Sequence, residues 1–246
     1  MGSICGWSGT GLGSDMSQQT VESMLEKSGG IAHTDPESNY DDSGALGISE
    51  GFYAASFLYQ DGNRVAIVGT PIWSDPELAV ISEEQGAGAA LIKAWRKFGK
   101  NLLSKLHGPF ALAIQDGDEA LIAIDRVGIH SLSYCLQDGV FIFSSSTESV
   151  VKHPSVSRCI DPQAIYNYLY FHDIPSPGTI YKEVEKLLPA QYLLFRNGHI
   201  NKGFYWKLHF DEDSHVSFQA HKKHFLELLR QSVKASSEDS SVASFL

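Results

Sequence analysis

The sequence has few cysteines and no long hydrophobic run. Its 246 residues include three cysteines, Cys5, Cys135 and Cys159, which are too few and too scattered for a disulfide framework or a zinc site. No apolar run approaches the roughly 20 residues of a membrane span, and the N-terminus lacks the basic and then apolar pattern of a secretory signal. We therefore expect a cytoplasmic protein that does not bind membranes.

Basic residues are also scarce, because 19 Lys and Arg face 29 Asp and Glu, for a net charge of -10. Binding to a nucleic-acid backbone needs a dense basic surface, so no nucleic-acid partner is expected. His221 and His224 lie about one helical turn apart, but no third ligand accompanies them. The sequence therefore predicts no metal site.

Short apolar segments separated by turn residues make up most of the chain. The pairs Asp61-Gly62, Asp138-Gly139 and Asn197-Gly198 are typical of tight hairpins. Regular short strands with such turns indicate antiparallel sheets. The predicted strands are 4–7, 52–59, 64–69, 110–115, 120–124, 132–136, 140–143, 191–195 and 199–205. Residues 31–43, which are mostly polar, are expected to form a loop.

Four segments have the apolar period of helices: 17–27, 85–98, 162–171 and 218–233. In the third, Asp161 is the expected N-cap and Pro162 the first helical residue. Helices beside antiparallel strands predict an α+β fold.

Two groups of residues on these elements are predicted to be structural. The aromatic side chains of the third helix are expected to pack in the core and not to form a ligand platform; they are Tyr166, Tyr168, Tyr170 and Phe171. Asp125 and Arg126 are expected to hold a turn through a local ion pair and not to act in catalysis.

Five segments, in one order, resemble class II glutamine amidotransferases of the asparagine synthetase family. Residues 108–116, GPFALAIQD, are similar to the family strand G-M-F-A-F-A-I-W-D, and 125–129, DRVGI, to its D-R-x-G-I turn. The other three are 134–148, 177–189 and the Tyr205-Trp206 pair, which resemble the family's next hairpin, its P-x-T-I…L-x-P segment and its closing Y-W.

The resemblance implies a four-layer αββα Ntn-hydrolase-like sandwich of two antiparallel sheets. Residues 1–210 would form the glutaminase-like domain. Residues 211–246 would form a linker and the truncated start of an ATP-dependent synthetase domain, because in the family a helix and a strand lead from the Y-W to a phosphate-binding loop. The chain itself is expected to need no cofactor, whereas ATP and magnesium belong to the missing synthetase domain.

The family's catalytic nucleophile is a cysteine next to the initiator methionine, whose own α-amine acts as the base. When Ile4, Gly6 and Trp7 are aligned with the family start M-C-G-I-x-G, Gly2 falls at the nucleophile position. A second register reads Cys5-Gly6-Trp7-Ser8-Gly9 as C-G-x-x-G. That register would make Cys5 the nucleophile, after cleavage behind Ile4.

The family's substrate-binding motifs are also altered. The arginine of R-G-P-D, which holds the substrate carboxylate, has no counterpart in 33–36, HTDP. In the N-G-E motif, Val68 replaces the oxyanion-binding asparagine and Gly69 is retained. The D-T-E motif, which binds the substrate ammonium, is replaced by 87–89, AGA.

These departures favour a glutaminase-like domain that cannot hydrolyse glutamine and serves as a scaffold in an ATP-dependent amide-forming enzyme. Its expected partner is a synthetase domain, in the same chain or in a separate one. One alternative is an active glutaminase that uses Cys5 after processing. The other is a stand-alone binding protein, in which self-association as a homodimer would cover the exposed edge.

Overall fold

The structure is a computed structural model that describes residues 2–9, 12–26, 35–51, 54–210 and 216–235. It divides into two units, Met1–Lys207 and Leu208–Leu246. In the second unit, the described residues include helix α6 (Phe218–Ala235). None of the described helices is both long and apolar enough to cross a lipid bilayer.

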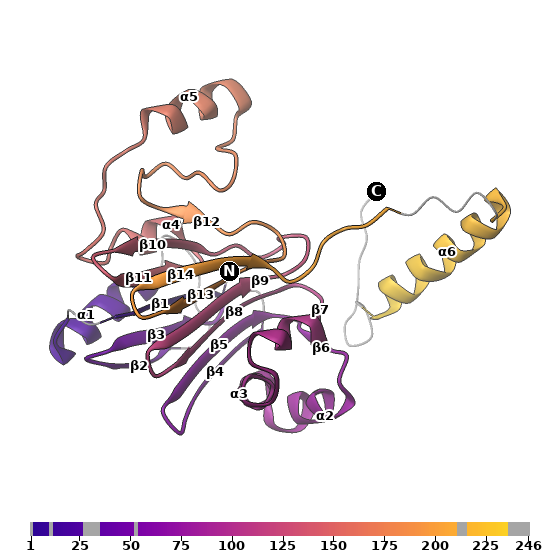
Figure 1. The fold of residues 1–246 in the computed structure, drawn as a ribbon, viewed down its shortest axis with the longest axis horizontal. Helices are drawn as coiled ribbons and strands as arrows, with labels where there is room; N and C mark the ends of the chain where they lie inside the picture. The colour runs from indigo at the N-terminus through magenta and orange to yellow at the C-terminus, as the bar shows by residue number, and fades with distance from the viewer. Residues whose placement is uncertain (1, 10–11, 27–34, 52–53, 211–215, 236–246) are drawn as a thin grey trace. The chain divides into compact units, whose positions relative to one another are not determined.

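The first unit contains two six-stranded antiparallel sheets within the described residues (Figure 1). The first sheet has the order β12-β10-β11-β1-β3-β2. Its strands, in chain order, are β1 (Ser3–Ser8), β2 (Glu37–Asp41), β3 (Gly44–Ser49), β10 (Ser133–Gln137), β11 (Val140–Ser144) and β12 (Glu185–Lys186).

The second sheet has the order β14-β13-β9-β8-β5-β4. Its strands are β4 (Ala55–Gln60), β5 (Asn63–Gly69), β8 (Phe110–Asp116), β9 (Glu119–Ile124), β13 (Gln191–Arg196) and β14 (His199–Phe204). A small ribbon pairs β6 (Ile72–Trp73) with β7 (Leu106–His107).

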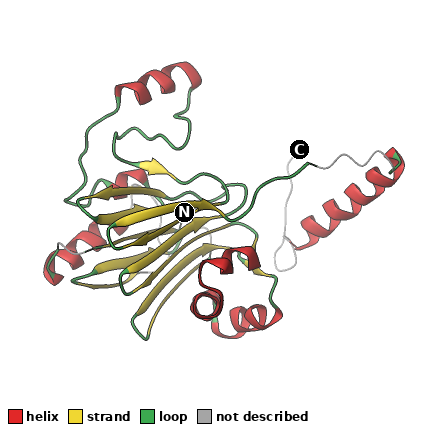
Figure 2. Ribbon diagram, in the orientation of Figure 1, coloured by secondary structure: helices red, strands yellow, loops and turns green. Residues whose placement is uncertain are grey.

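Helices cover the outer face of each sheet (Figure 2). Helix α1 (Ser14–Leu25) and the short α4 (Thr147–Val150) lie on the first sheet. Helix α3 (Ala87–Phe98) lies on the second sheet and packs against α2 (Pro76–Gln85) and the 3-10 helix η1 (Gly99–Lys105). Helix α5 (Pro162–Phe171) belongs to neither layer.

Three apolar clusters lie in these layers. One lies between the sheets and contains Ile4, Val68 and Phe143, among others. A second lies between the second sheet and α3, and a third between the first sheet and α1. The order of layers is therefore helix, sheet, sheet, helix, as the resemblance implied, and the α+β class is confirmed.

The hairpin turns follow the residue pairs that predicted them. Asp138 and Gly139, like Asn197 and Gly198, both have positive φ, as a type I′ turn requires. Asp161 caps α5 by accepting a hydrogen bond from the Gln163 N–H. Local backbone preferences alone account for these elements.

Five strands were not predicted: β2, β3 and the two-residue strands β6, β7 and β12. Residues 37–41, expected in a loop, form β2, and 44–49 form β3. Every residue of β3 is buried, so it lacks the alternation of polar and apolar side chains that identifies a half-exposed strand. Leu46 pairs with Gly6 on one side and with Asn39 on the other, so tertiary pairing defines this strand.

The single helix expected over 85–98 is replaced by two helices. Gly86, with a φ of +93°, ends α2 and starts α3. Helix α2 was missed although Asp75 caps it and Pro76 occupies its first turn. Few of its side chains are buried, so its sequence shows no clear apolar period.

The prediction that the α5 aromatics pack in the core was wrong. Tyr166, Tyr168, Tyr170 and Phe171 are all exposed, and Ala164 is the only buried side chain of the helix.

Candidate functional site

Gly2 lies buried directly before β1, and a β-carbon at this position would point towards the second sheet. A β-carbon at this position would lie 3.2 Å from the Ser49 carbonyl oxygen and 3.5 Å from Cγ1 of Val68. Gly2, which the first register aligns with the family's nucleophile, therefore lies next to Val68, which the same alignment places at the oxyanion asparagine. Gly2 offers no side chain to react there, and Val68 offers no hydrogen-bond donor.

Gly69 ends β5 in a backbone conformation that only glycine adopts easily. Its φ is +110°, and a β-carbon would lie 2.3 Å from the Pro109 carbonyl oxygen. The backbone conformation alone therefore explains why a glycine occupies position 69, and no catalytic role is needed to explain it.

The Gly69 N–H already has an acceptor, because it donates to the Ala54 carbonyl oxygen at 2.9 Å. An oxyanion hole needs a donor that is directed at the reacting oxygen and is not engaged by the protein. In this structure, neither the side chain of Val68 nor the N–H of Gly69 supplies such a donor.

Cys5 lies in the middle of β1, paired with Ser144 on one side and Gly47 on the other. Its side chain is fully buried in the cluster beneath α1, on the opposite face from Ile4. Sγ lies 3.9 Å from the Val21 carbonyl oxygen. Burial raises the pKa of the Cys5 thiol far above its usual value, which disfavours the reactive thiolate.

The other substrate-binding positions are only partly described. His33 and Thr34 lie outside the described residues, and Asp35 and Pro36 are exposed. Residues 87–89 form the first turn of α3, where the Gly88 N–H donates to Oγ of Ser56 at 3.0 Å. Ser56 pairs with Ile67, next to Val68, so this turn lies near the same end of the second sheet. It contains no carboxylate that could bind an ammonium group.

The turn after β9 is held by Asp125, but not through the ion pair that was expected. The buried Asp125 carboxylate accepts the N–H groups of Val127, Ile129 and His130 at 3.0 to 3.1 Å. No ion pair or hydrogen bond of the Arg126 guanidinium occurs within the described ranges. Asp125 therefore stabilises the turn as expected, but it does so by binding backbone N–H groups and not through an ion pair with Arg126.

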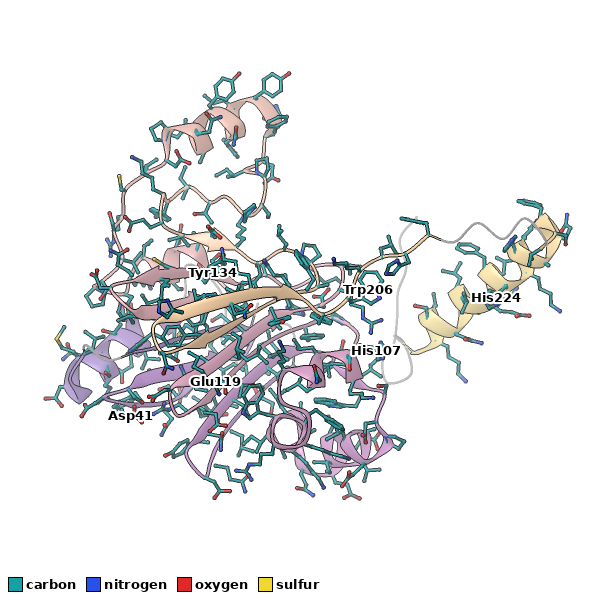
Figure 3. The ribbon with its side chains drawn as sticks, viewed as in Figure 1. Asp41, His107, Glu119, Tyr134, Trp206 and His224 are labelled. Carbon is teal, nitrogen blue, oxygen red and sulfur yellow. The ribbon has the colours of Figure 1, made fainter. Side chains whose placement is uncertain are left out.

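Arg126 stacks on an aromatic ring, a feature that the sequence did not indicate. Its guanidinium carbon lies 5.6 Å from the centroid of the Trp206 ring. His107 is nearby (Figure 3 labels His107 and Trp206). Burial and the charge of Arg126 lower the pKa of His107, which favours the neutral imidazole.

His130 is a further residue that sequence reasoning missed. A β-carbon on Gly69 would lie 2.8 Å from its Nε2 atom, so the ring of His130 packs directly against the retained glycine. Burial lowers the pKa of His130, although the charge of Asp125 opposes that effect. Its place directly after the DRVGI segment is the only sequence signal for this contact.

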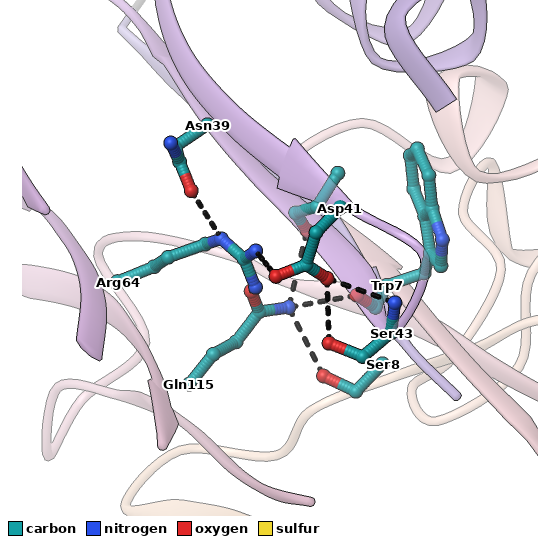
Figure 4. Close-up of polar contacts among 8 residues, drawn as sticks. Trp7, Ser8, Asn39, Asp41, Ser43, Arg64 and Gln115 are labelled. Atoms are coloured by element: carbon teal, nitrogen blue, oxygen red, sulfur yellow. Dashed lines mark hydrogen bonds and ion pairs between the residues drawn. The ribbon is translucent and has the colours of Figure 1, made fainter. Parts of the chain in front are cut away.

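A polar network joins the two sheets at the opposite end of the sandwich (Figure 4). Arg64 pairs with Asp41 and donates to Oδ1 of Asn39 at 2.7 Å. The buried amide of Gln115 donates to the Trp7 carbonyl oxygen at 2.7 Å. This network lies at the far ends of β1 and β5 from Gly2 and Val68, so it supports the fold and not the candidate site.

His221 and His224 lie on exposed turns of α6. No group of three histidine, cysteine or acidic side chains with the geometry of a metal site occurs in the described part of the chain.

Comparison with known proteins identifies similar sequences. A family model described as a glutamine amidotransferase domain matches residues 83–206. Putative asparagine synthetase 2 (glutamine-hydrolyzing) from Methanocaldococcus jannaschii is 32% identical over 124 residues, which are 48% of this chain and 24% of that protein. Asparagine synthetase 3 (glutamine-hydrolyzing) from Bacillus subtilis is 26% identical over 121 residues, which are 48% of this chain and 20% of that protein. The match thus spans about a quarter or less of these curated relatives.

Among solved structures, one described as the allosteric regulatory enzyme of purine biosynthesis has a similar fold. The TM-score is 0.52 at 14% sequence identity, and the match covers 83% of this chain and 49% of the other. At this identity the likeness concerns the fold alone.

Proposed function

Because the chain belongs to the glutamine amidotransferase domain family, in its asparagine synthetase branch, we propose that it is a form of this domain that does not hydrolyse glutamine. In this proposal it serves as a scaffold for an ATP-dependent synthetase that forms an amide bond. The synthetase is a domain of the same polypeptide or a separate chain, and it alone binds ATP and magnesium.

The proposal that the domain does not hydrolyse glutamine rests mainly on the arrangement of Gly2, Val68 and Gly69. In the proposed alignment Gly2 falls at the nucleophile position and has no thiol, and the apolar side chain of Val68 lies beside Gly2. The Gly69 N–H is engaged by the Ala54 carbonyl. Loss of one oxyanion donor typically lowers the rate by about 100- to 1,000-fold. Loss of the nucleophile removes the covalent route altogether.

The position of Cys5 argues against the processed glutaminase. The α-amine needed as a base exists only after cleavage behind Ile4, yet Ile4 is buried in the core between the sheets. Cleavage would remove that side chain, and the thiol of Cys5 would still face the α1 layer. An active Cys5 therefore requires β1 to rotate or shift by one residue, which would exchange its two buried faces.

Glutamine hydrolysis by the intact chain tests the first part of the proposal. We expect no glutamate release above the uncatalysed rate and no adduct on Cys5 after incubation with 6-diazo-5-oxonorleucine, an electrophilic glutamine analogue. Iodoacetamide should alkylate the exposed Cys159, which serves as the positive control for thiol labelling. Glutamate release that disappears in a Cys5→Ser variant would contradict the proposal.

The scaffold role is tested separately. We expect a synthetase sequence with the phosphate-binding pattern S-G-G-x-D-S either downstream in the same reading frame or in a neighbouring gene. A genome with no such sequence near this gene would refute the scaffold role, whereas the result of the glutaminase assay would still stand.

A further inference from the structure

The arginines of the first unit differ in what their guanidinium groups contact. Four of them donate a hydrogen bond to a protein oxygen: Arg64, Arg96, Arg158 and Arg196. Arg126 makes no ion pair or hydrogen bond within the described ranges. Acidic residues outnumber basic ones by 29 to 19, so an arginine without an oxygen partner is unusual in this chain. Its N–H donors are available to an external anion.

The neighbouring carboxylate of Asp125 does not serve Arg126. Asp125 is 1% exposed, and both of its carboxylate oxygens accept backbone N–H groups of the turn that follows. The charge of Asp125 is therefore stabilised within the turn. Among the described residues, no acidic side chain lies within ion-pair distance of Arg126.

Trp206 holds the guanidinium in place. The guanidinium carbon of Arg126 lies 5.6 Å from the centroid of the Trp206 ring, which is half-buried. The preceding residue is fixed to the second sheet, because the Tyr205 hydroxyl donates to the Ile124 carbonyl oxygen at 2.8 Å. A guanidinium that is already oriented loses less conformational freedom when it binds a ligand.

The guanidinium is also partly withdrawn from water. Arg126 is half-buried, and its Nε–H is buried without an acceptor in the part of the chain that the structure describes. The two terminal nitrogens, Nη1 and Nη2, are not buried in this way. A partly desolvated charge attracts an opposite charge more strongly than the charge of an exposed side chain does.

The charge around Arg126 fits a single carboxylate. His107 lies nearby, and burial together with the charge of Arg126 lowers the pKa of His107, which favours the neutral imidazole. Figure 3 labels His107 and Trp206, which lie with Arg126 at one end of the second sheet. A guanidinium matches a carboxylate in charge and in shape, because both are planar and can form two parallel hydrogen bonds. A phosphate dianion would keep an uncompensated charge there.

We propose that Arg126, stacked on Trp206 and flanked by His107, binds a carboxylate group. The carboxylate belongs to a small molecule or to an acidic side chain of another protein, and both sources present the same planar anion. Val127 and Ile129, on the same turn, are exposed apolar residues that can contact the rest of such a ligand. The inference goes beyond the proposed function and does not depend on whether the chain hydrolyses glutamine or supports a synthetase.

Nuclear magnetic resonance of the isotope-labelled full chain tests the proposal. The chain is titrated with sodium succinate at a low ionic strength of about 20 mM, where screening is weak. We expect the Arg126 Nε–H signal and the Trp206 indole N–H signal to shift together and to saturate, with a dissociation constant of about 1 mM. Arg126→Lys and Trp206→Phe assign the two signals.

Arg126→Gln should raise this dissociation constant at least about 10-fold, as followed by the Trp206 signal. Arg126→Lys keeps the charge but has no planar fork, so it should weaken binding by about 5-fold. Arg196→Gln is the matched control, because Arg196 is an exposed arginine that already pairs with Glu119. We expect it to leave succinate binding unchanged.

A blocked peptide, acetyl-Val-Glu-Val-amide, distinguishes the two sources of the carboxylate. Binding at least about 10-fold tighter than that of succinate supports a protein side chain as the ligand, and equal or weaker binding supports a small molecule. The peptide with glutamine in place of glutamate is its control, and it should not bind.

Four results would overturn the proposal. One is a shift that never saturates or that sodium chloride reproduces, since it would report only the general effect of salt. Another is succinate binding that Arg126→Gln leaves intact. The third is inorganic phosphate that binds more tightly than succinate. The fourth is a glutamine peptide that binds as well as the glutamate peptide.

Discussion

The buried His153 should make the stability of this protein depend on pH. Its ring is 1% exposed and meets the Trp7 ring edge-on, with centroids 5.1 Å apart. Nδ1 accepts the Ser155 N–H at 3.2 Å, and the buried Nε2 has no hydrogen-bond partner in the described residues. A charge here would be desolvated with no acidic group to balance it, so burial lowers the pKa of His153 from 6.5 to about 4.

The sign follows from proton linkage. The folded state resists protonation of His153, whereas the unfolded state accepts a proton near pH 6.5, so the unfolded state binds more protons between these two pKa values. The stabilising contribution of the neutral His153 is therefore fully present above pH 6.5. It is lost progressively as the pH falls towards the pKa of His153 in the folded state. For pKa values of 6.5 and about 4, the loss between pH 8 and pH 5 is about 2 kcal/mol.

The assay is urea unfolding at pH 8, 6.5 and 5, followed by intrinsic fluorescence. The test variant is His153→Asn, because the amide oxygen of asparagine can accept the Ser155 N–H in place of Nδ1 and does not titrate. We expect it to remove about 2 kcal/mol of the pH dependence, whatever its stability at pH 8. His199→Asn, at an exposed histidine, controls for the general effect of losing an imidazole.

Protonation of carboxylates also destabilises the folded protein in acid. The quantity compared is therefore the difference in pH dependence between the variant and the natural chain. If His153→Asn unfolds with the same pH dependence as the natural protein, or if His199→Asn removes as much of it, the reasoning about the buried imidazole is refuted.

Three further predictions concern residues that hold the two ends of the sandwich, each measured as a change in the free energy of unfolding. Gly69→Ala should cost at least about 2 kcal/mol more than Gly62→Ala. Both glycines have positive φ, but only at position 69 would the new β-carbon meet a backbone oxygen at 2.3 Å; equal costs would show that this contact relaxes easily. Asp125→Ala should cost about 3 kcal/mol or more, because three backbone N–H groups lose their acceptor, and a cost below about 1 kcal/mol would mean that water replaces the carboxylate. Arg64→Met should cost about 2 kcal/mol, because the guanidinium of Arg64 is buried in an inter-sheet network. Arg196→Met, at an exposed arginine, should cost less than about 1 kcal/mol. A reversal of this order would contradict the role assigned to the network.

Turns and caps were predictable because the residues that form them act locally. Asp138-Gly139 and Asn197-Gly198 accept the positive φ that a two-residue hairpin needs, and Asp161-Pro162 begins α5 as expected. The ordered motifs of the resemblance led to the correct fold, since they mark a strand, a turn and a hairpin of the same architecture.

The pattern of apolar and polar residues did not predict which faces of β3 and α5 are buried. Strand β3 is buried on both faces, so no alternation marks it. In α5, apolar residues occupy most of the helix surface, so its sequence does not indicate which side faces the protein. Only the three-dimensional arrangement shows that Ala164 faces inward and Leu169 outward.

For the candidate site, the sequence by itself determined which chemical groups two of the aligned positions carry. Gly2 has no nucleophile, Val68 has no amide, and no later folding step can supply those atoms. Only the tertiary structure decided what Gly69 and Cys5 do. The Gly69 N–H is taken by Ala54, and Cys5 faces α1, because strand pairing and the alternation of side chains are set by partners far away in the chain.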